Sequence, residues 1–248
     1  MAGTSGKDAV LLIAEYDLTA KLNEMEITHT CGAEDSTVYE PSGDAEAFTA
    51  TLQGWTVRHR GFYAGGGTAT DLDEVVHNQF GSANPLFLAC PVGDATDSAG
   101  RAGYVVQLNS AIATPVAGLV TQDTNLSGDG PIDVVTLLHS RADAESTSGA
   151  NEGDTIDFGA ATTGARCYLF ITDVSGSSGS TVDVKVQDGT DGANWADLVT
   201  FTQATDATSE LKTDTGAVNR YLRAHWTLTG TNAAATFALA AAVDTGSG

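Results

Sequence analysis

Hydrophobic and polar side chains alternate from Phe48 to Tyr63, and this period of two predicts one long β-strand. Its two faces would carry Phe48, Ala50, Leu52 and Gly54 on one side and Thr49, Thr51, Gln53 and Trp55 on the other. Three glycines at 65–67 then remove any regular preference. Thr70 is a candidate N-cap for a short helix near 71–80, because three acids follow it in the first turn. This helix would cover one face of a sheet.

Similar period-two segments continue through most of the chain, separated by turns rich in glycine, serine and aspartate. These segments are 10–16, 25–30, 85–91, 104–108, 111–116, 132–138, 155–158, 166–173, 181–187, 195–201, 221–227 and 236–243. Their spacing predicts a mainly β fold, a barrel or sandwich with one short helix, followed by a C-terminal β-sandwich. The polar stretch 142–153 is the candidate linker, which gives two domains, 1–141 and 142–248.

Two polar segments are candidates for contacts with other molecules. Residues 1–7 form a short arm that contains glycine and serine. Residues 31–47 carry five acids and a proline, and this segment is too long for a tight hairpin turn. Two interpretations of it stay open, a contact with a partner and a solvated loop.

Charge narrows the classes of partner. The chain of 248 residues has 11 Lys and Arg against 32 Asp and Glu, a formal net charge of −21. Both halves are acidic, with 6 basic against 18 acidic residues up to Arg141 and 5 against 14 after it. Such a chain repels nucleic acid, whose phosphates are bound by clustered Lys and Arg. A hydrophobic fraction of 42% is nevertheless enough for a real core.

The beginning of the chain does not resemble a secretory leader. The apolar run from Ala9 to Ala14 is too short and has a single lysine before it, and no later run approaches the length of a membrane span. We therefore expect a protein made in a cytosol, without a membrane partner.

Metal and cofactor sites are not expected. The three cysteines, Cys31, Cys90 and Cys167, are far apart and form no CxxC pair, so we expect free thiols that are mostly buried. The histidines form no HxxH or HExxH motif. They are His29, His59, His77, His139 and His225.

The remaining candidates for chemistry each have a plain structural interpretation. Arg58 and Arg60 share one face of the predicted strand and His59 points to the other, which favours an exposed, salt-bridged arginine pair over an acid–base site. Asp188 and Asp191 lack the spacing and the closing glutamate of a calcium loop, which favours a β-turn.

Glycines and aromatic residues suggest two further sites. Gly65–Gly67 would cradle an anion only poorly, because acids already occupy the following helix N-terminus. Two interpretations are open for a set of aromatic residues, a stacking platform for carbohydrate and a position in the core. Their β spacing favours the core. The residues are Trp195, Trp226, Tyr221 and Phe237. No GxSxG, Walker or GxGxxG motif occurs, so no catalytic residue is assigned and we expect no enzyme.

Several segments together resemble the major tail tube protein of long-tailed, siphovirus-type bacteriophages, particularly those of actinobacterial hosts. The first match is EYDLTAKLNEMEITHTCGAEDSTVYE, then FTATLQGWTVRHRGFYAGGG and a short helix at DLDEVV. The second is GYVVQLNSAIATPVAG with GDGPIDVVTLLHS. The third, VKVQDGTDGANWADLVTFT with RYLRAHWTLTGTNAAATFALAAAV, resembles the β-sandwich appended to many tail proteins. The apolar VLLIAEY near the start departs from the family pattern.

The resemblance implies a structural virion protein. Similar proteins form hexameric rings that stack into the tail tube, with tape measure, tail tip and tail terminator proteins as partners, and genomic DNA passes through the lumen without sequence-specific binding. It implies that N-terminal acids line the bore, that residues 1–7 and 31–47 join rings, and that residues 152–243 form an outward sandwich. Closed sheets would remove exposed edges, and an acidic wall would let DNA slide.

Two alternatives remain at this point. One is another virion component, a head decoration or baseplate protein that binds capsid or host-surface glycan through Trp195 and Trp226. The other is a secreted β-hydrolase with a dispersed active site, which the lack of paired carboxylates or a triad motif disfavours.

Overall fold

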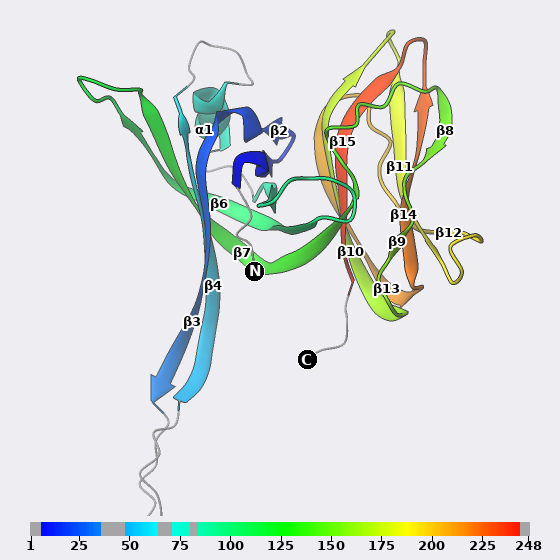
Figure 1. The fold of residues 1–248 in the computed structure, drawn as a ribbon, viewed down its shortest axis with the longest axis horizontal. Helices are drawn as coiled ribbons and strands as arrows, with labels where there is room; N and C mark the ends of the chain where they lie inside the picture. The colour runs from blue at the N-terminus through cyan, green and yellow to red at the C-terminus, as the bar shows by residue number, and fades with distance from the viewer. Residues whose placement is uncertain (1–5, 36–47, 64–70, 80–83, 244–248) are drawn as a thin grey trace, which may run out of the picture. The chain divides into compact units, whose positions relative to one another are not determined.

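The computed structural model describes residues 6–35, 48–63, 71–79 and 84–243, and it is mainly β with one α-helix in these residues (Figure 1). The strands are β1 Val10–Ile13, β2 Tyr16–Asp17, β3 Leu22–Asp35, β4 Phe48–Phe62, β5 Leu86–Cys90, β6 Ala99–Ala113, β7 Thr121–His139, β8 Gly149–Glu152, β9 Ile156–Asp157, β10 Thr162–Ser175, β11 Thr181–Gly189, β12 Ala196–Thr200, β13 Thr208–Val218, β14 Tyr221–Thr229 and β15 Ala234–Val243. The helix is α1 Leu72–Gln79, and two 3-10 turns lie at Gly6–Asp8 and Thr19–Lys21. The expected mainly β fold is confirmed.

The long strand and the short helix predicted around residues 48–80 are both present, as β4 and α1. The predicted N-cap Thr70, the glycines 65–67 and Phe80 lie outside the described residues, as does most of the expected loop 31–47. The start of that loop was wrong, because β3 continues through Cys31 to Asp35 and pairs with β4 to its end.

The chain divides into two compact units that differ from the predicted domains. The first contains residues 1–20, 85–104 and 132–248, and the second contains residues 21–84 and 105–131. Strands β6 and β7 therefore contribute residues to both units. The predicted boundary at 141/142 falls inside the first unit, so independent folding of 142–248 stays a prediction.

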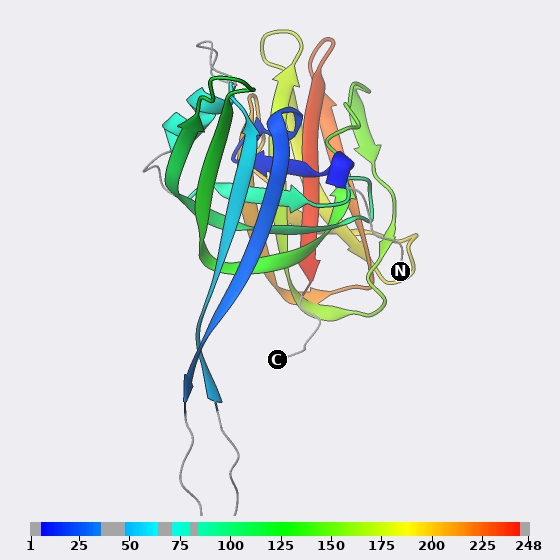
Figure 2. The same cartoon turned by 60° about the vertical axis from the view of Figure 1, so that its left-hand side comes forward.

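A β-sandwich forms much of the first unit (Figures 1 and 2). One of its sheets has the strand order β12-β11-β14-β8, with β9 also paired to β14. The facing strands β13, β10 and β15 continue through β7, β6, β5 and β1 to β2. The core between the sheets is built from alternate residues of each strand, such as Val184 on β11, Leu169 on β10 and Leu239 on β15.

Strands β10 and β15 are buried on both faces. On β10, Leu169 and Ile171 enter the sandwich core, whereas Tyr168 and Phe170, which alternate with them, enter a second core. Residues of β1, β5 and β7 complete this second core, among them Val10, Leu12, Leu86, Leu88 and Leu137. Side chains near the start of the chain thus cover the outer face of the C-terminal strands. An uninterrupted apolar run on β10, CYLFI, is the pattern expected of a strand with no solvent face.

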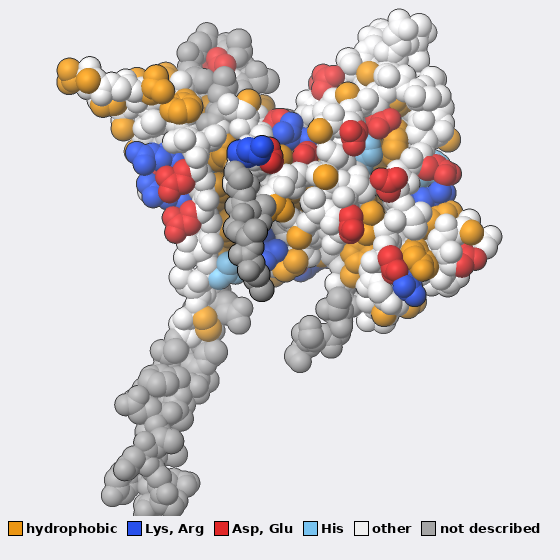
Figure 3. Space-filling view, in the orientation of Figure 1, with side chains coloured by type: hydrophobic (Ala, Val, Ile, Leu, Met, Phe, Trp, Pro, Cys, Tyr) orange, Lys and Arg blue, Asp and Glu red, His pale blue; other side chains and the backbone are white. Residues whose placement is uncertain are grey.

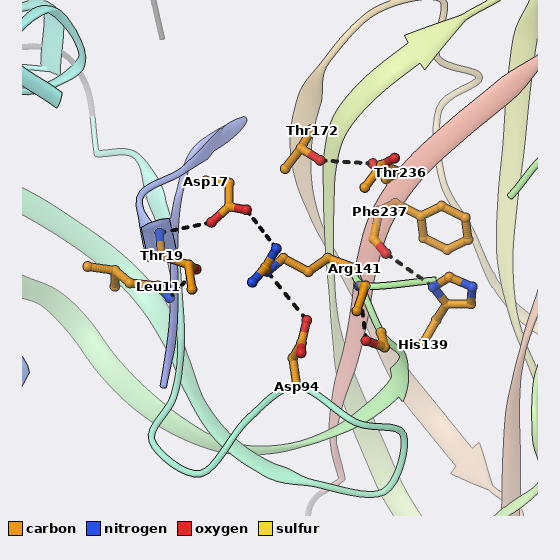
Figure 4. A network of polar contacts seen from close by, with 11 residues as sticks. Leu11, Asp17, Thr19, Asp94, His139, Arg141, Thr172, Thr236 and Phe237 are labelled. Atoms are coloured by element: carbon orange, nitrogen blue, oxygen red, sulfur yellow. Dashed lines mark hydrogen bonds and ion pairs between the residues drawn. The ribbon is translucent and has the colours of Figure 1, made fainter. Parts of the chain in front are cut away.

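Residue 141 itself is tied to the N-terminal segments of this unit (Figure 4). Arg141 donates from Nη1 to Asp17 Oδ2 at 2.8 Å, and its Nε lies 3.4 Å from Asp94 Oδ2. Both carboxylates are at most one-third exposed, so the guanidinium is held between them in a partly buried ion-pair network. The hydrogen bond joins the loop after β7 to β2, and the ion pair joins it to the loop after β5.

His139, at the end of β7, is also fully enclosed. Its ring stacks on Phe237 with centroids 4.1 Å apart and meets Trp226 edge-on at 4.8 Å. Its Nδ1 lies 3.1 Å from the Phe237 carbonyl oxygen, and its Nε2 lies 3.1 Å from Glu145 Oε1. These contacts fasten the segment before β8 to the sandwich.

The second unit is a four-stranded antiparallel sheet, β3-β4-β7-β6, with α1. Here β7 contributes residues 121–131 and β6 contributes residues 105–113. A Cβ at Gly128 would lie 1.9 Å from Trp55 Cε2, so only glycine admits the indole at this point. Trp55 Nε1 donates to the Gly130 carbonyl at 2.8 Å, which fixes the ring across β4 and β7.

The doubly buried strand predicts that fragment 142–248 is less stable than the same residues in the whole chain. The fragment would expose Tyr168 and Phe170 and lose β7 as the neighbour of β15, so the free energy of unfolding should fall by roughly 3–6 kcal/mol. Urea unfolding followed by tryptophan fluorescence measures this. Trp55→Phe in the whole chain leaves both proteins with Trp195 and Trp226 alone. Equal midpoints and slopes would show that 142–248 is an independent domain.

Candidate assembly surfaces

The sheet of the second unit has one buried face, made by alternate residues of β4 and β7. Trp55, Val57 and His59 on β4 are buried, and so are their neighbours Thr124 and Leu126 on β7. The helix α1 lies on this side, since buried Gln122 donates from Nε2 to Asp73 Oδ1 of α1 at 3.2 Å. The inward side chains of α1 are Leu72, Val75 and Val76.

His59 is an unusual member of this buried face. Neither of its ring nitrogens has a hydrogen-bond partner among the described residues, although the side chain is only 1% exposed. Thr124 on β7 is paired with His59 in the sheet, and its Oγ1 also has no hydrogen-bond partner among the described residues. Burial lowers the pKa of His59 to about 4, and the charge of Asp123 acts weakly in the opposite direction. The ring is therefore neutral at pH 7.

The opposite face of the sheet is polar and carries a ladder of charges. Glu24 and Glu26 on β3 stand in register with Arg60 and Arg58 on β4. Arg58 also forms a two-bond ion pair with Asp123 on β7, with Nε to Oδ1 at 3.0 Å. These bonds raise the pKa of Arg58 and lower that of Asp123. The predicted exposed arginine pair, with His59 on the other face, is confirmed.

Both edges of this sheet are open in the residues that the structure describes. Strand β3 pairs with β4 on one side, and no described strand lies on its other side. Strand β6 pairs with β5 only as far as Tyr104, so residues 105–113 have β7 alone as a neighbour. Open edges present unpaired backbone N–H and C=O groups, which another strand can bind.

The chain between β6 and β7 exposes apolar side chains. We call Leu108–Leu119 the β6–β7 hairpin surface, and every residue in it is exposed. The relative exposures of its larger apolar side chains are 56% for Leu108, 49% for Ile112, 109% for Val116 and 69% for Leu119. Figure 3 shows hydrophobic side chains gathered along this hairpin. Alternation predicted strands at 104–108 and 111–116, but it cannot reveal which edge of a sheet is left uncovered.

The aromatic residues considered for a carbohydrate platform do not lie on one surface. Trp226 and Phe237 are buried in the sandwich core, as β spacing predicted. Trp195 is half-buried, with the guanidinium of Arg223 4.4 Å from its ring centroid. Tyr221 is also half-buried and carries the Arg220 guanidinium on its ring. The Trp195 and Trp226 pair of the glycan alternative therefore has no common exposed face.

The acidic turn after β11 is held by its own backbone. Asp191 accepts hydrogen bonds from the backbone N–H groups of Ala193 and Asn194 and from the Asn194 side chain, and these bonds lower its pKa to about 2. Asp188 is buried and accepts from Asn219 N at 2.8 Å. The turn interpretation of the sequence agrees with this geometry. The described residues contain no group of three or more His, Cys, Asp or Glu that could hold a metal ion.

The cysteines are free thiols, as predicted, with Cys90 and Cys167 buried and Cys31 exposed. Burial raises the pKa of both buried thiols to about 12, so they are un-ionised and unreactive at pH 7. Among the described helices, none is long and apolar enough to cross a membrane.

No protein-family model matches the chain, and neither does any curated protein. Solved structures do resemble parts of it. The virion of a native gene transfer agent particle contains a chain that is 16% identical, with a TM-score of 0.42, covering 53% of this chain and 98% of that one. The SPP1 tail tube is 9% identical with a TM-score of 0.39, covering 52% and 77%. The SPP1 Dit protein, a hub adsorption protein, is 12% identical with a TM-score of 0.35, covering 94% and 98%.

Buried His59 predicts a loss of stability in mild acid. In the unfolded chain His59 binds a proton below its ordinary pKa of 6.5, but in the folded protein only below about 4. The contribution is therefore fully present above pH 6.5 and is lost as the pH falls towards 4, by roughly 3 kcal/mol in total. We expect His59→Leu to flatten the dependence of the unfolding free energy on pH in this window, measured by urea denaturation. Thr124→Val changes the same packing without a titratable group and should keep the wild-type slope. A His59→Leu slope equal to the wild type would contradict the assignment.

Proposed function

We propose that the protein is a structural subunit of a phage tail tube, in which rings of this chain stack into the conduit for DNA. The observation that carries this proposal is the sheet of the second unit. It is buried on one face and polar on the other, and within the described residues it is open at both edges. A sheet of this kind reaches a closed state by joining its edges to those of further copies. The resemblance of the sequence segments supports the same assembly.

In this proposal the face with Glu24, Glu26 and Asp123 is turned towards the bore. Acids outnumber arginines there, and Arg58 and Arg60 are already paired with these acids, so DNA phosphates would find no free cationic site. The wall would then hold DNA without trapping it. Hexameric rings, and contacts to tape measure, tail tip and terminator proteins, remain part of the proposal, as does location in the virion tail after synthesis in the bacterial cytoplasm.

We propose that the protein is not an enzyme. The titratable groups with large pKa shifts among the described residues have structural explanations. Burial is the main cause for His59, Cys90, Cys167 and Tyr168, and local hydrogen bonds are the main cause for Asp157 and Asp191. Residues 1–7 and 31–47 remain the proposed contacts between rings. A head decoration or baseplate protein is the alternative, and glycan or capsid binding without self-assembly would identify it.

Electron microscopy of the purified protein over a concentration and salt series tests the tube. Each copy carries a formal charge of −21, so copies repel one another at low salt, and added salt should favour rings or hollow tubes. Size-exclusion elution followed in parallel should shift to larger species over the same series. Compact monomers in every condition, also after addition of a tail-tip complex, would refute the tube.

A lysine on the polar face tests which face lines the bore. Thr28 is exposed on β3 beside Glu26 on this face, and Thr28→Lys adds one positive charge per copy. Tubes of this variant, assembled with duplex DNA, should retain the DNA at low salt and release it at high salt, measured by co-sedimentation. Ser148→Lys adds the same charge at an exposed residue of the first unit and should leave retention at the wild-type level. Equal retention by the two variants would show that the polar face does not line the bore.

A further inference from the structure

The β6–β7 hairpin surface lacks the protection that soluble proteins give to an uncovered edge. Every residue from Leu108 to Leu119 is exposed, and the edge strand within it presents Leu108 and Ile112 to solvent. Natural edge strands are usually blunted by charged side chains, especially lysine, or by proline within the strand. Residues 105–113 contain neither. Exposed apolar surface of this kind marks a site that another molecule can cover.

The other open edge of the same sheet is built differently. Strand β3 carries Glu24 and Glu26, which are exposed, and Arg58 and Arg60 on β4 stand beside them. Charges of this kind oppose indiscriminate pairing at the β3 edge. The contrast singles out the β6–β7 hairpin surface.

The distribution of charge indicates what kind of molecule covers the β6–β7 hairpin surface. Between Arg101 and Asp123 the chain has no charged residue, although the whole protein carries a formal charge of −21. A cationic partner would find no acid here to bind. A second copy of this chain, which is equally acidic, can approach this surface without placing like charges in direct contact.

We propose that the β6–β7 hairpin surface is a docking site for a second copy of this chain, in which Leu108, Ile112, Val116 and Leu119 become buried. This docking site rests on the proposed function, because the second copy belongs to the same assembly. It adds the apolar contact through which the two copies would meet. Val116 is wholly exposed in the single chain, so it has the most apolar area to lose on docking.

The test is a charge introduced at this surface, read by self-association of the full chain. Ile112→Asp/Val116→Asp should raise the protein concentration needed for self-association at least tenfold, as measured by sedimentation velocity and electron microscopy. Because a buried, unpaired carboxylate is costly, the effect should persist in high salt. Val116→Asp alone should act in the same direction, and it alters a side chain without contacts in the single chain, so folding should be unchanged in thermal unfolding.

Val92→Asp is the matched control, since it adds the same charge at another exposed valine, 49% exposed and in the first unit. It should associate like the wild type. If wild-type protein and the hairpin variants form tubes at equal concentrations, the docking site is refuted and the tube proposal stands. If the wild type forms smaller oligomers but never tubes, and the hairpin variants stay monomeric, the docking site stands and the tube proposal fails. Absence of any wild-type self-association, also after addition of a tail-tip complex, would refute both.

Discussion

Burial of strand β10 on both faces is the constraint on which the first unit depends. A strand with no solvent face needs an apolar neighbour above and below, and Leu169 and Phe170, adjacent in sequence, satisfy the two sides. The sandwich supplies one neighbour, and β1, β5 and β7 supply the other. Segments separated by more than a hundred residues are thereby placed in one core. The ion pairs of Arg141 with Asp17 and Asp94 connect the same segments through polar contacts.

The second unit has a different constraint, because its sheet has one buried face and one polar face. Among the described residues, the buried face contains His59, neutral and without a hydrogen-bond partner, and the arginines of the polar face, Arg58 and Arg60, are paired with acids. The charged side chains on the polar face are exposed, and each ion pair contributes little to the free energy of unfolding. Their arrangement matters more for what the face repels. Among the described residues, the open edges leave backbone groups without a neighbouring strand, and another strand can bind such groups.

The apolar β6–β7 hairpin surface and the net charge of the chain act against one another. In the proposed assembly, mutual repulsion would keep the acidic copies apart, whereas burial of this uncharged apolar surface would draw them together at short range. The balance between the two depends on ionic strength and concentration. A subunit of this design can remain dispersed at low concentration and assemble when copies accumulate.

Much of the local structure was determined by the sequence alone. Alternation predicted β4 and most later strands, helical spacing predicted α1, and opposite faces for Arg58 and His59 followed from the period of two. Core positions for Trp226 and Phe237 followed for the same reason. Only the tertiary structure decided which strands became neighbours. It placed β10 and β15 of segment 142–248 in one core with residues near the start of the chain. It also left the edge at 105–113 uncovered among the described residues. Periodicity indicates whether a side chain faces solvent or the core. It does not indicate which distant segment packs against that side chain.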